Sequence, residues 1–132
     1  MSYGSRDWQN WVLEQGEALP LLEHAFKVGI NTWDTSDLYS NGRSEETIAK
    51  AISTYNIPRD ELVLVTKCRF GTSRPGEPQM SMYAATMNDG RMVNRVGLSG
   101  KHIFDAVQAS VKRLGTYIDK FKEWTQMCHK RR

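Results

Sequence analysis

The sequence predicts an α/β protein whose strands form a parallel sheet. Helical and strand patterns alternate along the chain, which is typical of strands joined by crossover helices. Residues 62–66 form a near-continuous apolar run, as expected of a parallel strand that is buried on both faces. Asp34 and Lys67 end two successive strand patterns, and reactive groups in parallel folds lie at such ends.

Three segments show the apolar spacing of helices. Residues 17–28 are predicted to form the first, with Pro20 in its first turn and Gly29 as its stop. Ser44 is expected to cap a second helix, and Ser99 a third that runs to about residue 114. The expected buried faces are Leu19, Leu22, Ala25 and Phe26 in the first, Ile48, Ala51, Ile52 and Tyr55 in the second, and Ile103, Val107, Val111 and Leu114 in the third.

The predicted strands are short, and one connection is long. Residues 30–34 and 62–66 are rich in strand formers, and residues 116–119 are expected to begin a third strand. Residues 68–97 are irregular and hold Met80, Met82, Met87 and Met92; an adaptable lid and a loose insertion both fit that composition. Trp8 and Trp11 interrupt a polar N-terminal segment and are expected to cover apolar surface.

Composition indicates a globular protein and excludes several classes. Of the 132 residues, 39% are hydrophobic and 25% charged, and no apolar run approaches the roughly 20 residues of a membrane span. The first ten residues lack the pattern of a secretory signal, so a cytoplasmic location is expected. Cys68 and Cys128 form no CxxC pair, and no metal site is predicted. Residues 120–132 hold five basic side chains against one acidic, so the basic pI does not indicate nucleic-acid binding by the rest.

The strand ends suggest a proton donor. Asp34, Tyr39 and Lys67 are expected to converge at the carboxyl edge of two neighbouring strands. A lysine charge would lower the pKa of the phenol from its usual value of about 10, and an aspartate would hold that lysine in place. An alternative is a structural ion pair between Asp34 and Lys67, against which Tyr39 merely packs.

Several of these segments resemble the aldo-keto reductase family. The motifs, in chain order, are GINTWDTSDLYSNGRSEE at 29–46, LVLVTKC at 62–68, NDG at 88–90, GLS at 97–99, KHIFDAV at 101–107 and RLGTYID at 113–119. The likeness is greatest to fungal members found in secondary-metabolite pathways. It implies a (β/α)8 TIM barrel, of which this chain would hold about the first half. It also implies NADPH-dependent reduction of a small-molecule aldehyde or ketone to an alcohol.

The resemblance assigns roles to the three candidate residues. It implies that Tyr39 donates a proton to the carbonyl oxygen and that Lys67 lowers the pKa of that phenol. It implies that Asp34 pairs with Lys67 and lies near the nicotinamide ribose of the cofactor.

The match ends at Asp119, which predicts two regions: residues 1–119 as the N-terminal part of the barrel, and residues 120–132 as a divergent basic tail. Trp124 stands where the family has a catalytic histidine, and neither His102 nor His129 matches that motif. The first hypothesis is therefore a truncated reductase with little activity of its own.

Two other hypotheses stay open. In the first, the tail is a basic amphipathic helix, with Phe121, Trp124 and Cys128 on one face, that binds an acidic partner or a membrane surface without catalysis. In the second, two copies of the chain pair to close the open sheet. The substrate cannot be inferred from the sequence.

Overall fold

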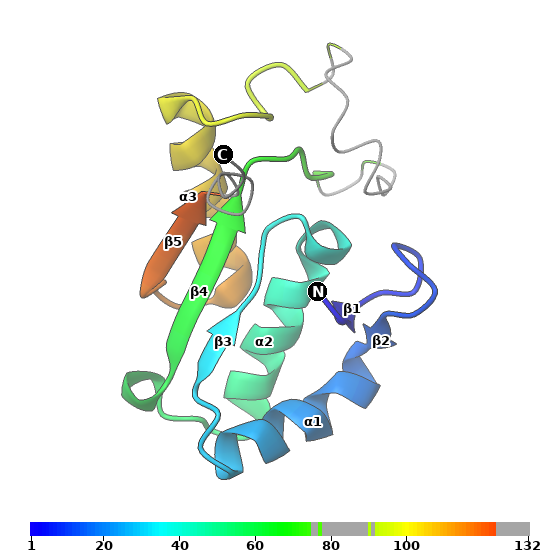
Figure 1. Cartoon of the computed structure of the whole chain (residues 1–132), viewed down its shortest axis with the longest axis vertical. Helices are drawn as coiled ribbons and strands as arrows, with labels where there is room; N and C mark the ends of the chain where they lie inside the picture. Colours follow the sequence, from blue (N-terminus) through cyan, green and yellow to red (C-terminus); the bar gives the residue numbers. More distant parts are fainter. Residues whose placement is uncertain (75–76, 78–89, 91, 124–132) are drawn as a thin grey trace, which may run out of the picture.

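Three parallel strands connected by helices form a sheet along one side of the molecule (Figure 1). The computed structural model describes residues 1–74, 77, 90 and 92–123. The elements in chain order are β1 (Tyr3–Gly4), β2 (Leu13–Glu14), α1 (Gln15–Lys27), β3 (Thr32–Asp34), η1 (Tyr39–Gly42), α2 (Arg43–Thr54), η2 (Arg59–Glu61), β4 (Val63–Cys68), α3 (Gly100–Leu114) and β5 (Lys120–Glu123).

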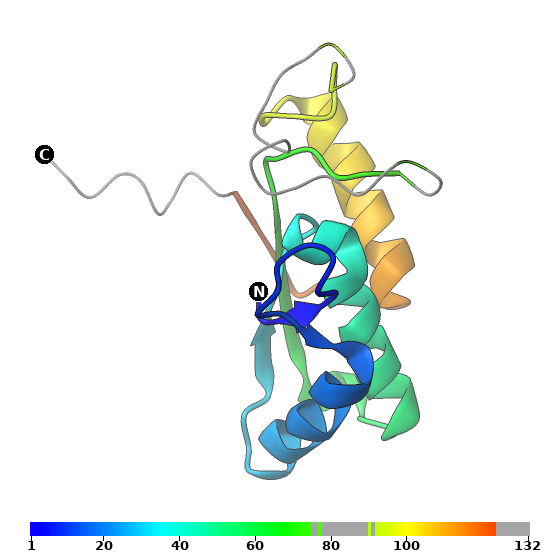
Figure 2. The same cartoon turned by 90° about the vertical axis from the view of Figure 1, so that its right-hand side faces the viewer.

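The sheet has the strand order β3-β4-β5, and both pairs are parallel. The register sets Asp34 beside Val65, and Lys67 beside Lys122. Because side chains alternate along a strand, Asp34, Lys67 and Lys122 project from one face and Leu64 from the other. Figure 2 shows α2 and α3 together on one side of the sheet. The predicted parallel sheet with crossover helices is confirmed.

The main core lies between the sheet and the helices. Its buried members come from α1, α2, α3, β3, β4 and the α2–β4 connection. They are Leu22, Trp33, Ile48, Ala51, Ile57, Leu62, Leu64 and Leu114. Burying apolar side chains of this size contributes roughly 1.5–3 kcal/mol each, which is what fixes the helices on the sheet.

The first helix begins earlier than predicted. Glu14 is its N-cap, and a capping box joins Glu14 and Glu17, with the Glu14 N–H donating to Glu17 Oε2 at 2.9 Å. This start at Gln15 leaves Pro20 beyond the first turn, so the prediction that Pro20 lies in the first turn is wrong.

The second helix is not capped by Ser44, which corrects the sequence-based expectation. Gly42 is the N-cap, in the left-handed region at φ 92°, and α2 starts at Arg43. Ser44 is buried inside the helix, where its hydroxyl accepts a hydrogen bond from Thr35 Oγ1 at 3.0 Å. That bond ties the start of α2 to the loop after β3.

The ends of α3 agree with prediction, whereas of the four residues expected on its buried face only Leu114 is buried. The N–H of His102 donates to Ser99 Oγ at 3.2 Å, and the helix stops at Gly115, at φ 65°. Val111 is exposed, and the buried positions are His102, Ala106, Ser110 and Leu114. Small and polar side chains bring α3 against α2, where a buried ion pair joins the two helices.

The third strand begins at Lys120, so the prediction that it starts within 116–119 is wrong. The connection is held by Arg59 instead, which donates from Nε to Thr116 Oγ1 at 3.2 Å and from Nη2 to the Tyr117 carbonyl at 2.9 Å. Its guanidinium lies 3.9 Å from the centre of the Tyr117 ring.

Residues 120–123 are extended, so no helical face can start at Phe121 as the tail hypothesis required. Trp124, Cys128 and His129 lie outside the described residues, as do Met80, Met82 and Met87. Met92 is described, and its side chain is buried.

The two N-terminal tryptophans behave differently. Trp8 is buried against Val12, Leu38 and Tyr39, as predicted for a residue that covers apolar surface. Trp11 is half exposed, although its ring packs edge-on against that of Trp8, with the ring centres 6.4 Å apart. The short parallel pair of β1 and β2 holds this segment beside α2.

Candidate active site

Neighbouring strands deliver two opposite charges to one edge of the sheet. Asp34 is the last residue of β3, and Lys67 lies next to the end of β4. Lys67 Nζ donates a hydrogen bond to Asp34 Oδ2. The Lys67 side chain is only 11% exposed, whereas that of Asp34 is 48% exposed. The pair therefore combines a mostly buried ammonium with a carboxylate that still meets solvent.

The loop after β3 brings Tyr39 to the same place. The backbone of this loop stays on β4: Thr35 N–H donates to the Val65 carbonyl at 2.8 Å, and Asp37 N–H to the Lys67 carbonyl at 3.1 Å. Tyr39 then begins η1, and its ring centre lies 5.2 Å from Lys67 Nζ. The convergence of the three predicted residues is thus present in the fold.

The pKa of Tyr39 is shifted in the direction opposite to the one expected from the sequence. Burial, and after it the negative charge of Asp34, raise the pKa of the Tyr39 phenol above its usual value. From the sequence, Lys67 was expected to lower this pKa. Because the ammonium is bound to Asp34, the carboxylate offsets the charge that the phenol would otherwise feel. At neutral pH the phenol therefore keeps its proton, as a proton donor must.

A third charged residue was missed from the sequence. Lys122 on β5 places its Nζ 3.7 Å from Asp34 Oδ1, the oxygen that Lys67 does not use. Residues 120–132 were predicted to be a divergent tail. Had the strand been extended past Asp119, the alternation of side chains would have placed Lys122 in line with Lys67.

A buried polar layer on the helix side supports the loop that carries Tyr39. Glu45 of α2 is fully buried and accepts two short hydrogen bonds, from Thr66 Oγ1 and from Arg113 Nε, both at 2.6 Å. Gly42 lies against Arg113, and a Cβ there would come within 2.6 Å of Arg113 Cδ. Burial, followed by the charge of Glu45, raises the pKa of Asp37 to about 7. None of these residues was singled out from the sequence.

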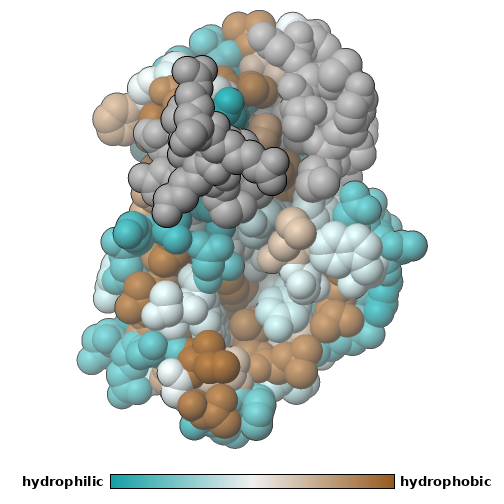
Figure 3. Space-filling view, viewed as in Figure 1, coloured by the Kyte–Doolittle hydropathy of each residue, from teal (hydrophilic) through white to brown (hydrophobic). Residues whose placement is uncertain are grey.

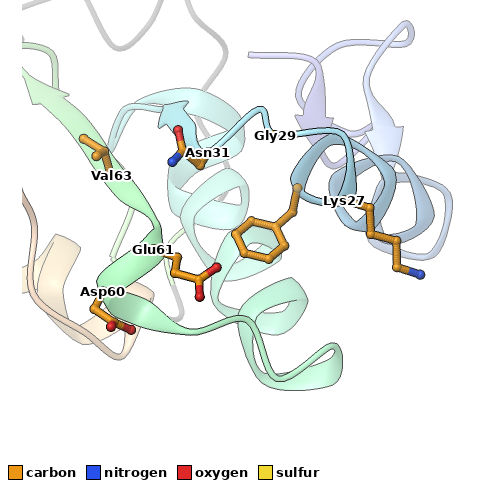
Figure 4. A pocket seen from close by; sticks show the side chains of 7 residues that line it. Lys27, Gly29, Asn31, Asp60, Glu61 and Val63 are labelled. Atoms are coloured by element: carbon orange, nitrogen blue, oxygen red, sulfur yellow. The ribbon is translucent and has the colours of Figure 1, made fainter.

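A cavity lies at the other end of the strands. It measures about 530 Å³, and its lining residues are Phe26, Lys27, Gly29, Asn31, Asp60, Glu61 and Val63. Figure 4 shows the carboxylate of Glu61 beside the cavity and Lys27 pointing away from it. Apolar surface gathers at this end of the molecule, where Val28 and Ile30 are more than half exposed (Figure 3). In parallel α/β folds the reacting groups lie at the carboxyl ends of strands, so we place the candidate active site at Asp34, Tyr39 and Lys67.

The described ranges contain neither a candidate metal site nor a candidate membrane span. No group of three or more His, Cys, Asp or Glu side chains there is arranged to hold a metal ion. No helix there has the length and apolar character required to cross a bilayer.

Known proteins are similar to this chain in sequence and in fold. The model of the aldo/keto reductase family matches residues 1–123. Versiconal hemiacetal acetate reductase of Aspergillus parasiticus is 55% identical over 119 residues, which are 90% of this chain and 35% of that protein. The aldo-keto reductase dtxS3 of Metarhizium robertsii is 47% identical over 122 residues, 88% of this chain and 33% of that protein. The chain thus spans about a third of the length of these relatives.

A solved structure has the same fold over most of this chain. An aldo-keto reductase of Bacillus halodurans, determined in its holo form, superposes with a TM-score of 0.62 at 26% identity, covering 83% of this chain and 31% of that one. The parallel strands and crossover helices described above correspond to a part of its (β/α)8 barrel. The chain therefore belongs to the aldo/keto reductase family and carries an incomplete (β/α)8 barrel.

Proposed function

We propose that the protein containing these residues reduces the carbonyl group of a small-molecule aldehyde or ketone to an alcohol, with NADPH as the reductant. The observation that carries this proposal is the convergence of Asp34, Tyr39 and Lys67 at the carboxyl edge of β3 and β4. Membership of a reductase family supports the reaction class.

Tyr39 is the proposed proton donor. Its phenol is protonated at neutral pH, because burial and the Asp34 charge raise its pKa. After it gives its proton to the developing alkoxide, the phenolate must be stabilised. The mostly buried ammonium of Lys67, 5.2 Å from the ring centre, supplies a positive charge beside the ring.

Asp34 is proposed to position both Lys67 and the cofactor. NADPH, when bound, supplies the hydride. Asp34 fits a sugar hydroxyl of such a cofactor, because its carboxylate is about half exposed and accepts hydrogen bonds. This fit concerns the nicotinamide-ribose end of the cofactor only.

The biological setting is proposed from the relatives. The Aspergillus parasiticus relative is named as a reductase of versiconal hemiacetal acetate, and it shares 55% identity over the matched segment. We propose a role in a secondary-metabolite pathway and, following the sequence-based expectation, a cytoplasmic location. The choice of one carbonyl substrate over another is left to experiment.

A chimera tests the proposal. In the Aspergillus parasiticus relative, the aligned 119-residue segment is replaced by that of this chain, and NADPH oxidation is followed with carbonyl substrates. We expect turnover, and a fall in kcat by about 10²–10⁴-fold in Tyr39→Phe with unchanged NADPH binding. Tyr117→Phe is the control, because the Tyr117 side chain is exposed. A folded chimera that binds NADPH but reduces no carbonyl would contradict the proposal.

The 132-residue chain alone is a separate case. We propose that it has little or no turnover, because Asp34 meets solvent and a water-filled site weakens every charge interaction in it. Measured NADPH-dependent reduction by the purified monomer would refute this. Pairing of two copies through the edges of β3 and β5 is the alternative route to a closed site, and light scattering that shows only monomer would exclude it.

A further inference from the structure

The carboxylate of Asp34 lies between two ammonium groups that come from different strands. Lys67 of β4 binds Oδ2, and Lys122 of β5 lies 3.7 Å from Oδ1. The register pairs Lys67 directly with Lys122, so both side chains leave the same face of the sheet. Each oxygen of the carboxylate thus has its own cation.

The geometry points to Lys122 as a positioning residue of this site, which holds the free oxygen of Asp34 and offsets the carboxylate charge that acts on Tyr39. The inference concerns the site of the proposed function and rests on Tyr39 being its acid.

A neighbouring lysine shows that the contact is selective. Lys120 is on the same strand and the same face, beside Val65, and among the residues the structure describes it forms no ion pair. Lys122, two residues further along, is 40% exposed and turns toward Asp34 across the position of Lys67. Strand register, rather than a general excess of lysine on β5, brings the second ammonium to the carboxylate.

The expected consequence is electrostatic. The charge of Asp34 is the second cause, after burial, of the raised pKa of Tyr39. A cation on Oδ1 reduces that effect, so loss of Lys122 should make the phenol a weaker acid. The charged groups that interact with Asp34 in the described part of the chain are Lys67, Lys122 and the amino group of Met1. Of these, Lys122 can be changed without touching the proposed catalytic residues.

The test reads the ionisation of Tyr39 in the 132-residue chain and needs no turnover. Fluorinated tyrosine is incorporated, because it moves the phenol titration to a pH at which lysine remains charged, and ¹⁹F NMR follows the titration. Tyr39→Phe assigns the signal. We expect about a twofold fall in the ionisation constant of Tyr39 in Lys122→Gln, and values close to the parent in Lys122→Arg and in the control Lys120→Gln.

The same change is then made in an Asp34→Asn chain. Because the inferred effect passes through the carboxylate, Lys122→Gln should shift Tyr39 much less there. An equal shift with and without Asp34, an equal shift in Lys120→Gln, or no shift at all would overturn the inference. If Lys122→Gln lowers stability, as circular dichroism would show, Lys122→Arg against Lys122→Met gives the same comparison. Failure here leaves the reductase assay of the chimera untouched, so the two proposals fail separately.

Discussion

Arg113 of α3 and Glu45 of α2 form an ion pair, Nε to Oε2 at 2.6 Å, in which the carboxylate is completely buried and the arginine side chain is 19% exposed. The other oxygen of Glu45 is bonded to Thr66 of β4, so one carboxylate joins two helices and the sheet. Burying a charge is costly unless it is paired and hydrogen-bonded, and here both conditions are met. The pair therefore ties α3 to α2 and helps to set how the two helices pack.

Removal of Arg113 should destabilise the chain strongly. In Arg113→Met, Glu45 is left as a buried charge without its cation, and we expect a loss of about 3–5 kcal/mol in the free energy of unfolding. Urea denaturation measures it. Lys101→Ala is the control, since the Lys101–Asp105 pair is exposed and worth less than about 0.5 kcal/mol. Adding Glu45→Gln to Arg113→Met should restore much of the loss; a double variant as unstable as the single one would contradict this account.

Asp37 should give the chain a pH-dependent stability. Its pKa is raised to about 7, mainly by burial, so between its unfolded value near 3.8 and pH 7 the folded state binds more protons than the unfolded state. Stability should therefore fall as pH rises through this range, by a few kcal/mol at most. Asp37→Asn should remove that part of the slope and be the more stable chain at pH 8.

Denaturation midpoints of the two chains at pH 4.5, 6 and 8 decide the matter. Asp105→Asn is the matched control, because Lys101 lowers the pKa of Asp105 and its contribution has the opposite sign. If the Asp37→Asn chain keeps the parent slope between pH 4.5 and 7, the assignment to Asp37 is wrong.

Short sequence patterns predicted a strand and a helix cap correctly. The apolar run at residues 62–66 and the cap at Ser99 can be recognised from a few consecutive residues, and both are confirmed. The errors come from distant contacts. The third strand was expected to begin within residues 116–119, but it begins at Lys120, and Arg59, some sixty positions away, binds residues 116 and 117 ahead of it. Of the apolar stripe that was expected to be buried in α3, only Leu114 is buried, and Arg113 fixes the polar side of the helix on α2.

In the candidate site, too, some features could be predicted from the sequence and others could not. Asp34 and Lys67 could be predicted because strand ends in a parallel sheet share an edge, and Tyr39 because it follows one of them closely. Lys122 could not, since its place depends on the strand that was taken to end at Asp119. The direction of the Tyr39 pKa could not either, because burial sets it and depends on Trp8, Val12 and Leu38 packing around the ring.

The two glycines that flank α3 should respond oppositely to alanine. Gly100 opens the helix with ordinary φ and open space around it, so Gly100→Ala should stabilise the chain by about 0.4–1 kcal/mol. Gly115 has φ 65°, which a side chain disfavours, so Gly115→Ala should cost about 1 kcal/mol. Thermal unfolding of the two variants gives the signs. Equal signs would mean that one of the helix ends is misplaced.

The negative charge of Asp34 should keep the pKa of Tyr39 high. In Asp34→Asn the negative charge is lost and Lys67 faces the ring unneutralised, so the pKa of Tyr39 should fall below that of the parent chain. The shift can be followed by NMR of ¹³C-labelled tyrosine, with Tyr39→Phe as the assignment. Asp60→Asn serves as the control, because Asp60 lies at the amino end of β4, away from the ring. Lys67→Met should move the pKa the other way. If Asp34→Asn left the Tyr39 titration where it was, the carboxylate would not act on the phenol, and the proposed division of roles among the three residues would have to be abandoned.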